Sequence, residues 1–515
     1  AASDVYKRQD FNLAKGTTNF TLNGGRNEYA IMGWFYRAAY DYKGKYLAEV
    51  NGRYDGTSRF PRGKRYGFFP SFSAAYRISE EAFFEPLRKT VDNLKIRLSY
   101  GSLGNQQIGY YDFIQTITTK GSMGDYSFDG TILGQHATVS DPVSGNQTWE
   151  KVISKNLGAD LNMFSNRLSL TADFYIRDTK GILGKGKSLP SIYGANEPQV
   201  NSNNLRTKGY ELVLGWRDSF KLAGSTFSYG ITGTFSDYTA EYTKCDNPSG
   251  LIGGPYVGKK YGEIWGYKVD GLFRNDEEAA EYASRVDLSK VAAGYYSATG
   301  AYGKGVRGGD IKYLDLDGSG IVDGGKGTLE DPGDRRVIGN SSPRYQYGLT
   351  LNLSWYGFDL SVFMQGIGRL DWYPGADNLR FWGPYSRPYA TFIPKNFMSQ
   401  VWSESNPDAY LPRARAYTSL NSTQGTAYYT NDRYLQNLAY CRLKNLTLGY
   451  TIPKRLTSKV GIKECRVYFS GENLATWSAL KNDFLDPEQA AADSDKKSNV
   501  YPWCRTYSVG LNLTF

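Results

Sequence analysis

The last nine residues, YSVGLNLTF (507–515), alternate strictly between apolar side chains and polar or small ones. Tyr507, Val509, Leu511, Leu513 and Phe515 occupy every second position, and serine, glycine, asparagine and threonine stand between them. A period of two places successive side chains on opposite faces of a β-strand. The stretch therefore predicts a strand with one apolar and one polar face, and its recurrence along the chain decides the fold.

The same two-faced pattern recurs about thirteen times between Trp34 and Phe515. In RLSLTADFYIRD (167–178), for example, the apolar residues alternate with Arg167, Asp173 and Arg177. A soluble β-sandwich has a core only ~10 Å thick and favours many short strands. Strands of ~9 to 11 residues with charged opposite faces and aromatic ends are typical of membrane barrels. The pattern predicts an all-β protein, a transmembrane antiparallel β-barrel.

Composition agrees with this fold and excludes several function classes. The chain has 515 residues with 58 glycines and 43 tyrosines, and no apolar run approaches the ~18 to 20 residues of a membrane helix. His136 is the only histidine and the four cysteines show no CxxC spacing, so zinc sites and His-based triads are poorly supported. Lysine and arginine are scattered among 51 acids, and the net charge of +10 therefore does not indicate nucleic-acid binding.

The connections between the expected strands alternate in length. Short ones are expected at 43–45, 79–90, 163–166, 218–225, 356–357 and 452–464, and long ones at 55–64, 102–146, 179–206, 240–342, 369–435 and 476–504. Outer-membrane barrels have short periplasmic turns and long extracellular loops. The alternation therefore predicts a periplasmic C-terminus and six long extracellular loops.

An odd number of strands has a consequence for closure of the barrel. With thirteen strands, the first and last run in the same direction and cannot pair antiparallel, and an open edge in lipid leaves backbone groups unsatisfied. We expect residues 28–515 to be a partial barrel, the C-terminal part of a larger one. Residues 1–27 are interpreted as an N-terminal remnant and outer-loop segment, with AASDVYKRQ (1–9) as a candidate scar.

Several stretches, in order from about residue 28 to the end, resemble SusC/RagA-type TonB-dependent outer-membrane transporters. They include LKIRLSYGSLGNQQIG (94–109), GGDIKYLDLDGSG (308–320), SGENLATWS (470–478) and YPWCRTYSVGLNLTF (501–515). The resemblance implies the last thirteen strands of a barrel of about 22 strands. It also implies a plug domain and a TonB box, neither of which is found in this chain.

The function implied by the resemblance is TonB-energised import of oligosaccharides, or of peptides, across the outer membrane of a Gram-negative bacterium. The implied partners are a SusD-like surface lipoprotein, the TonB complex acting through the missing N-terminal part, and outer-membrane lipid. Transport breaks no substrate bond, so no catalytic residue and no required cofactor are expected. A passive porin and a surface-binding barrel remain alternatives, whereas an outer-membrane enzyme is disfavoured by the single histidine.

The resemblance also gives the terminal strand a second role. Tyr507, Val509, Leu511, Leu513 and Phe515 look like the signal that the barrel-assembly machinery reads during insertion. Lipid contact alone is the alternative.

The stretch DLDGSGIVD (315–323) has the spacing of a calcium loop, with Gly320 at the sharp-turn position. Its oxygen donors at positions one, three, five, seven and nine are Asp315, Asp317, Ser319, the carbonyl of Ile321, and Asp323. Position twelve is Lys326 instead of glutamate, and Asp334 would supply the missing carboxylate if the residues between them bulge out. A structural Ca²⁺ would fix an outer loop; a solvated acidic turn is the alternative.

The long loop after Gly368 is rich in aromatic residues, namely Trp372, Tyr373, Phe381, Trp382, Tyr385 and Tyr389. Exposed rings at this density would stack on sugar rings or close against a lipoprotein lid, because rigid rings give contact area at low entropic cost. Mutual packing inside an ordered loop is the alternative.

Overall fold

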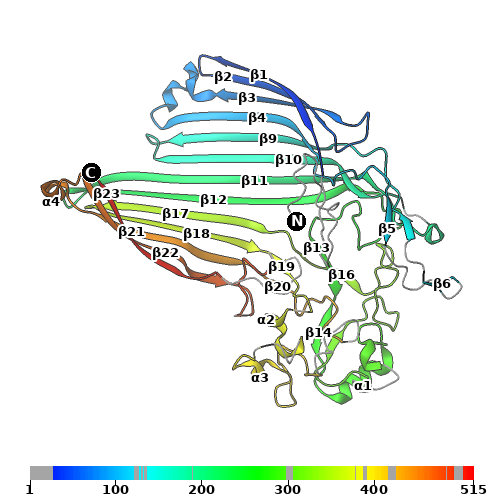
Figure 1. Ribbon diagram of the computed structural model, residues 1–515. Coiled ribbons are helices and arrows are strands. Elements are labelled where there is room, and N and C mark those ends of the chain that lie inside the picture. Colours follow the sequence, from blue (N-terminus) through cyan, green and yellow to red (C-terminus); the bar gives the residue numbers. More distant parts are fainter. Residues whose placement is uncertain are drawn as a thin grey trace, which may run out of the picture.

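The computed structural model describes residues 27–120, 127–128, 131–132, 136–187, 190–296, 305–376, 378–386, 391, 393–415, 425–482, 484–491 and 503–515. Its main feature is one sheet of thirteen strands, each paired antiparallel with the next (Figure 1). The strands are β1 (Ile31–Tyr42), β2 (Tyr46–Thr57), β3 (Tyr66–Arg77), β4 (Val91–Asn105), β9 (Glu150–Met163), β10 (Leu168–Lys185), β11 (Gln199–Leu222), β12 (Ser225–Lys244), β17 (Arg344–Trp355), β18 (Phe358–Arg369), β21 (Tyr440–Thr451), β22 (Glu464–Ser478) and β23 (Thr506–Thr514). The predicted number of strands is confirmed.

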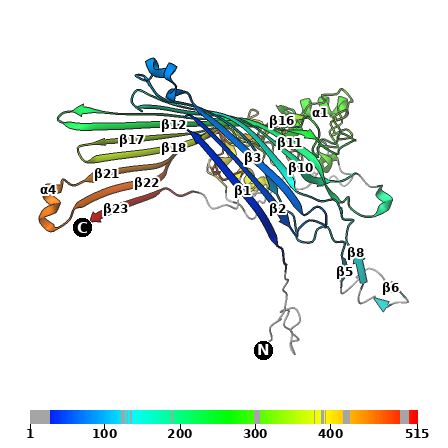
Figure 2. The same cartoon turned by 90° about the horizontal axis from the view of Figure 1, so that it is seen from above.

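The sheet is curved and twisted, and β1 and β23 form its two edges (Figure 2). Because the thirteen strands alternate in direction, these two edge strands run the same way, as expected. Among the described residues no helix is long and apolar enough to cross a membrane.

Short turns join the strands at one end of the sheet, which we call the turn end. The turns at 43–45 and 356–357 lie where the sequence predicts them. The turn expected at 218–225 is only two residues long, because β11 ends at Leu222 and β12 begins at Ser225. Its residues, Ala223 and Gly224, have φ of 49° and 85°, the positive values that tight hairpins between twisted strands require.

At the opposite end, the loop end, the strands are longer than the membrane alone requires. β10, β11 and β12 contain 18, 24 and 20 residues, against the ~9 to 11 expected. β11 pairs with β10 from Gln199 to Trp216 and with β12 from Asn204 to Leu222, so it has a partner strand on at least one side along its whole length. The loop expected at 179–206 is correspondingly shortened to 186–198.

The two faces of the sheet differ as the alternation predicts. Leu98, Phe174 and Leu214 are more than half exposed, although they are large and apolar. Arg97, next to Leu98, and Asp173, next to Phe174, are polar and lie on the other face. We call the first face outward and the second inward.

Smaller elements lie in the long connections at the loop end. The strands are β5 (Ile117–Lys120), β6 (Ser127–Phe128), β7 (Thr131–Ile132), β8 (His136–Val139), β13 (Glu263–Tyr267), β14 (Val269–Leu272), β15 (Ile311–Tyr313), β16 (Arg335–Asn340), β19 (Asp371–Trp372) and β20 (Gln436–Asn437). The helices are α1 (Asp276–Arg285), α2 (Leu379–Trp382) and α3 (Phe397–Gln400), while α4 (Lys454–Thr457) lies at the turn end. Asn275 caps α1 by accepting a hydrogen bond from the Glu278 amide.

Candidate functional site

The long loops at the loop end fold into a unit with its own hydrophobic core, which we call the loop assembly (Figure 1). The core contains residues from four ranges: 267–322, 370–411, 427–438 and 485–490. Buried members include Phe273, Leu288, Val291, Tyr313, Val322, Trp372, Trp382, Trp402, Leu411, Tyr434, Leu438 and Leu485. Four segments far apart in sequence therefore meet in one folded body.

A buried asparagine holds three of these segments together. The Nδ2 atom of Asn431 donates to the Tyr373 hydroxyl at 3.0 Å, to the Tyr313 hydroxyl at 3.3 Å and to the Tyr429 carbonyl at 2.8 Å. Its Oδ1 atom accepts from the Tyr434 amide. Burial raises the pKa of both the Tyr313 and Tyr373 phenols, so both stay protonated as donors. No sequence motif marks Asn431, because its partners lie 58 and 118 residues away.

The aromatic residues proposed to contact substrate belong to this core. Trp372, Tyr373, Phe381, Trp382 and Tyr385 are between 0% and 7% exposed, and Tyr389 lies outside the described residues. Trp382 packs edge-on against Tyr434, with ring centroids 5.1 Å apart. The expectation of exposed rings is therefore wrong for these five, because the loops supply enough apolar surface to bury them. Mutual packing, the alternative interpretation, describes their arrangement.

An ion-pair network joins the loop assembly to the sheet. The guanidinium of Arg442 on β21 is 2% exposed and contacts Asp486 at 2.5 Å and Glu488 at 2.8 Å. Lys444, two residues further along β21, contacts Glu488 at 2.7 Å. Breaking one partner of such a buried network leaves an uncompensated charge and is strongly destabilising. The contacts fix residues 486–488 against the wall of the sheet.

The inward face is lined by charges that are paired within the wall. Arg97 on β4 bridges Asp160 on β9 at 2.8 Å and Asp173 on β10 at 2.9 Å. Arg466 on β22 likewise contacts Asp359 on β18. Between these pairs the inward positions carry amides and hydroxyls, among them Ser71, Ser73, Ser99, Ser154, Asn156, Thr171, Thr234, Ser236, Gln346, Thr350 and Asn352. The face is polar and hydrogen-bonding, with much of its charge neutralised locally.

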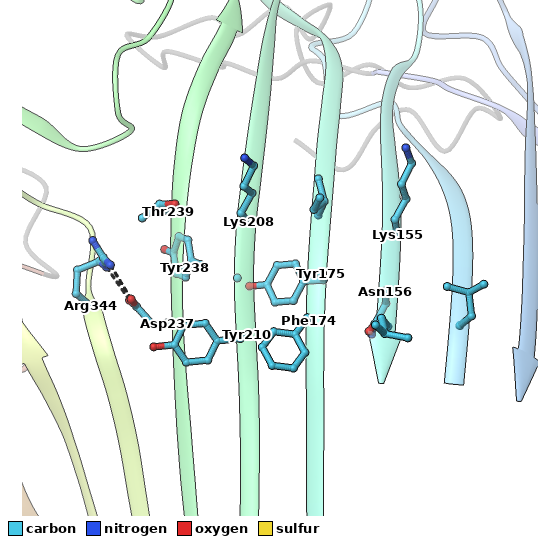
Figure 3. A pocket seen from close by; sticks show the side chains of 14 residues that line it. Lys155, Asn156, Phe174, Tyr175, Lys208, Tyr210, Asp237, Tyr238, Thr239 and Arg344 are labelled. Carbon is cyan, nitrogen blue, oxygen red and sulfur yellow. Dashed lines mark hydrogen bonds and ion pairs between the residues drawn. The ribbon is translucent and has the colours of Figure 1, made fainter. Parts of the chain in front are cut away.

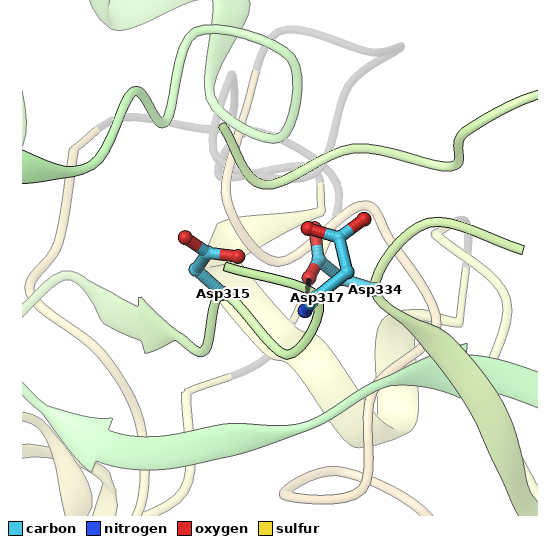
Figure 4. Close-up of side chains that lie close together, drawn as sticks. All are labelled: Asp315, Asp317 and Asp334. Atoms are coloured by element: carbon cyan, nitrogen blue, oxygen red, sulfur yellow. Dashed lines mark hydrogen bonds between the residues drawn. The ribbon is translucent and has the colours of Figure 1, made fainter. Parts of the chain in front are cut away.

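Three of the predicted calcium ligands meet in the acidic loop after β15 (Figure 4). Asp315, Asp317 and Asp334 each offer a carboxylate oxygen, and these oxygens lie within 4.8 Å of one another. The amide of Asp334 donates to the carbonyl of Asp323 at 3.0 Å, so residues 324–333 bulge out between them. The bulge agrees with the sequence-based expectation, and it places the Asp334 carboxylate beside those of Asp315 and Asp317.

Backbone contacts hold the acidic loop in this shape. The buried Asp334 accepts hydrogen bonds from the Leu316 amide at 2.6 Å and the Asp323 amide at 2.9 Å. Burial raises the pKa of Asp334, with the charge of Asp317 adding to the shift. The pKa of Asp317 is lowered, chiefly by hydrogen bonding with Ser319, whose backbone amide donates to the Asp317 carboxylate at 2.9 Å. Oxygen donors carrying several negative charges fit a divalent cation such as Ca²⁺.

The remaining predicted ligands do not join the carboxylate cluster. The Ser319 hydroxyl lies 3.0 Å from the Ile321 carbonyl and donates a hydrogen bond to it. The carboxylate of Asp323 accepts from the amide of Gly325 at 2.7 Å. The loop thus brings together Asp315, Asp317 and Asp334, and it occupies the other three donors with local contacts.

The terminal strand presents its apolar residues on the outward face. β23 pairs with β22 in regular register from Thr506 to Thr514. Its apolar residues are 41% to 79% exposed: Tyr507, Val509, Leu511, Leu513 and Phe515. The alternation that opened the sequence analysis therefore corresponds to a real outward row.

A wide antiparallel sheet with an exposed apolar face, a polar face and loops gathered at one end is the architecture of a membrane β-barrel. The family model described as "TonB dependent receptor-like, beta-barrel" matches residues 2–474. This chain therefore belongs to the TonB-dependent receptor β-barrel family, a family of outer-membrane proteins. The matched range includes residues 2–9, most of the segment interpreted as a candidate scar.

Individual relatives agree with this assignment. The chain is 27% identical to the TonB-dependent receptor P3 of Formosa agariphila, over 98% of the chain and 47% of that protein. It is 23% identical to the TonB-dependent receptor SusC of Bacteroides thetaiotaomicron, over 99% of the chain and 46% of that protein. Its fold matches the structure of the RagAB peptide transporter with a TM-score of 0.72 at 21% identity, over 98% of this chain and 49% of that one. The chain spans about half the length of these relatives.

Proposed function

We propose that this chain forms part of an outer-membrane importer that takes up oligosaccharides with energy delivered through TonB. The observation that carries the proposal is the loop assembly, a folded body with its own core at the loop end of a sheet whose inward face is polar. A passive pore needs an open passage, whereas here the loops pack together and are tied to the wall through Arg442. Family membership supports the same function.

The chemistry of the inward face favours oligosaccharides over peptides as substrate. Many of its residues are hydroxyls and amides, which donate and accept hydrogen bonds as sugar hydroxyls do. Arg97 and Arg466 are held by carboxylates of neighbouring strands, so they are not free to bind peptide termini or charged side chains. Transport of this kind breaks no substrate bond, and we propose no catalytic role for any residue.

The proposed partners follow from the same function. A SusD-like surface lipoprotein would cover the loop end, and the TonB complex would act on a part of the protein outside this chain. We also propose contact with the barrel-assembly machinery during insertion. A passive porin and a surface-binding barrel are the competing functions that the experiment must separate.

Uptake assays on the full-length protein test the proposal. A deletion strain complemented with the gene should accumulate labelled oligosaccharides, and a protonophore should abolish accumulation without removing the protein from the membrane. Labelled peptides of similar mass serve as the competing substrate class. Accumulation that persists without a proton gradient would indicate a passive pore, and preferential peptide uptake would overturn the substrate class.

We propose that the acidic loop binds one Ca²⁺ through Asp315, Asp317 and Asp334 and thereby fixes the connection between β15 and β16. Removing two of the three carboxylates, with Asp315→Ala and Asp317→Ala, should abolish stoichiometric calcium binding in calorimetry of the metal-free full-length protein. Asp331→Ala, in the bulged segment, is the matched control and should leave binding intact. A metal-free wild-type protein that takes up no calcium would identify the loop as an acidic turn.

We propose that the outward row of β23 serves insertion as well as lipid contact. Replacing Phe515 with aspartate breaks the terminal apolar row and should lower the amount of heat-modifiable, membrane-inserted protein several-fold. Thr514→Asp adds the same charge one position earlier, on the inward face, and should have a much smaller effect. Equal insertion of the Phe515→Asp variant and the wild type would leave lipid contact as the only role.

A further inference from the structure

Four lysines gather on the outward face of β9, β10 and β11, and we call them the lysine patch: Lys151, Lys155, Lys180 and Lys208. Lys155 and Lys208 are both opposite Ile176 in the register, one on each neighbouring strand. They therefore share the outward face with Ile176 and lie about 10 Å apart along the sheet. All four side chains are exposed.

The patch lies at the upper rim of the apolar band. Along the outward face of β11, the positions from Phe220 to Tyr210 are apolar or aromatic except for Asp218 near the turn end, and Lys208 is the next outward position. Ten residues of strand span about 33 Å, and a tilt of about 40° reduces this to a height of about 25 Å. That is the height of the lipid-facing band of an outer-membrane barrel. Lys208 and Lys155 therefore lie at the level of the lipid headgroups on the loop side.

The charges on this part of the outward face are not balanced. Two of its carboxylates are held by arginines, Asp178 by Arg206 at 2.6 Å and Asp237 by Arg344 at 2.6 Å (Figure 3). A third, Glu241, is opposite Arg206 in the register, which leaves the lysines in excess. In the part of the chain that the structure describes, no carboxylate forms an ion pair with any of the four lysines. Lys151 and Lys180 are even directly opposite each other in the register. Like charges in that position are destabilising unless an anion lies between them.

A mostly apolar groove lies beside Lys155 and Lys208, which form part of its lining. It has a volume of about 530 Å³, and its outward lining includes Leu98, Leu157, Phe174 and Tyr210. Figure 3 shows Lys208 extending toward the loop end above the rings of Tyr210 and Phe174, and Lys155 extending the same way above Asn156. A ligand bound here must combine an apolar chain directed into the membrane with an anionic group at its surface.

We propose that this face binds a phosphate-bearing glycolipid of the outer leaflet. One acyl chain occupies the groove over Leu157 and Phe174, and a phosphate is held between the ammonium groups of Lys155 and Lys208. Lys151 and Lys180 surround the rest of the anionic headgroup. Charge complementarity and depth in the membrane select this ligand, since a soluble anion makes no use of the groove and a neutral lipid makes no use of the lysines.

The proposal is tested by measuring how purified bisphosphorylated lipid A binds to the delipidated full-length protein. Native mass spectrometry detects the bound lipid. The variant Lys155→Ala with Lys208→Ala should bind about thirtyfold more weakly than wild type. The control variant Lys454→Ala with Lys459→Ala removes the same charge at the turn end and should bind as wild type does. Equal loss in both variants, or no loss in either, would overturn the site.

Two measurements on the unaltered protein distinguish the ligand chemistry. Lipid A from which the phosphates have been removed should bind far more weakly, and inorganic phosphate at millimolar concentration should not displace the intact lipid. Equal binding of the dephosphorylated lipid overturns the role of the lysines. Displacement by inorganic phosphate overturns the role of the groove. Retention of binding by Lys155→Arg with Lys208→Arg confirms that charge at these positions is what matters.

Discussion

The sheet and the loop assembly use aromatic residues in opposite ways. On the sheet, Trp34 is 57% exposed and Tyr40 is 64% exposed, whereas in the loop assembly Trp382 and Tyr434 are completely buried. The difference reflects two solvents, because lipid wets the outward face of the sheet and water surrounds the loops. An exposed aromatic ring is therefore normal on the outward face of the sheet, whereas in the loop assembly it would indicate a packing defect.

The two regions also differ in what holds them together. Each central strand of the sheet is fixed by backbone hydrogen bonds to two neighbours, and in lipid an unpaired backbone group costs several kcal/mol. The loop assembly has only short strands, and it depends on a packed core and on buried polar contacts such as those of Asn431. Side-chain changes should consequently damage the loop assembly more than the sheet.

The largest expected effect is in the loop core. Trp382→Ala removes a completely buried side chain and should destabilise the loop assembly by about 3–5 kcal/mol. Trp34→Ala on the outward face opens no enclosed cavity and should cost much less. Hydrogen exchange of the backbone at 379–386 and 426–438, measured in the full-length protein, should accelerate in the first variant only. Similar exchange in both variants would show that the loops do not depend on this core.

A charge on the sheet should distinguish its two faces. Leu214→Arg places a cation near the middle of the outward band and should cost about 2–4 kcal/mol of folding free energy in lipid. Val213→Arg adds the same charge on the inward face, opposite Thr171 and Thr234, where water can solvate it. Urea titrations of folding into lipid vesicles measure both values. A larger cost for Val213→Arg would reverse the assignment of the faces.

The smallest effect concerns the acidic loop and pH. A carboxylate must lose its proton to bind calcium, so affinity is constant above the folded-state pKa of Asp334 and falls as the pH drops through it. Burial raises this pKa, so the calcium affinity should begin to fall at a higher pH than it would with an ordinary aspartate. Below the pKa, the affinity should fall by up to about tenfold per pH unit. Calcium titrations of the full-length protein between pH 7 and pH 4 measure it. A flat profile down to pH 4 would contradict the participation of Asp334.

Much of the sheet could be predicted because the sequence pattern that specifies a strand involves only residues close together in the chain. Alternation along a strand assigns each side chain to a face without knowledge of any partner, and it gave thirteen strands and the outward row from Tyr507 to Phe515. The lengths of β10 to β12 were underestimated, because strands continue wherever a neighbour can pair with them. The spacing of the carboxylates predicted that Asp315, Asp317 and Asp334 come together, but it did not predict the local hydrogen bonds of Ser319, Ile321 and Asp323.

The sequence by itself determined the fold class, the two faces and the alternation of turns and loops, since each depends on neighbours within a few residues. Only the tertiary structure decided that Trp382 is buried, that Asn431 joins distant loops and that Lys155 and Lys208 flank Ile176. These contacts depend on chain segments separated by 20 to more than 100 residues. Packing and strand register bring such segments together, and no local pattern encodes either.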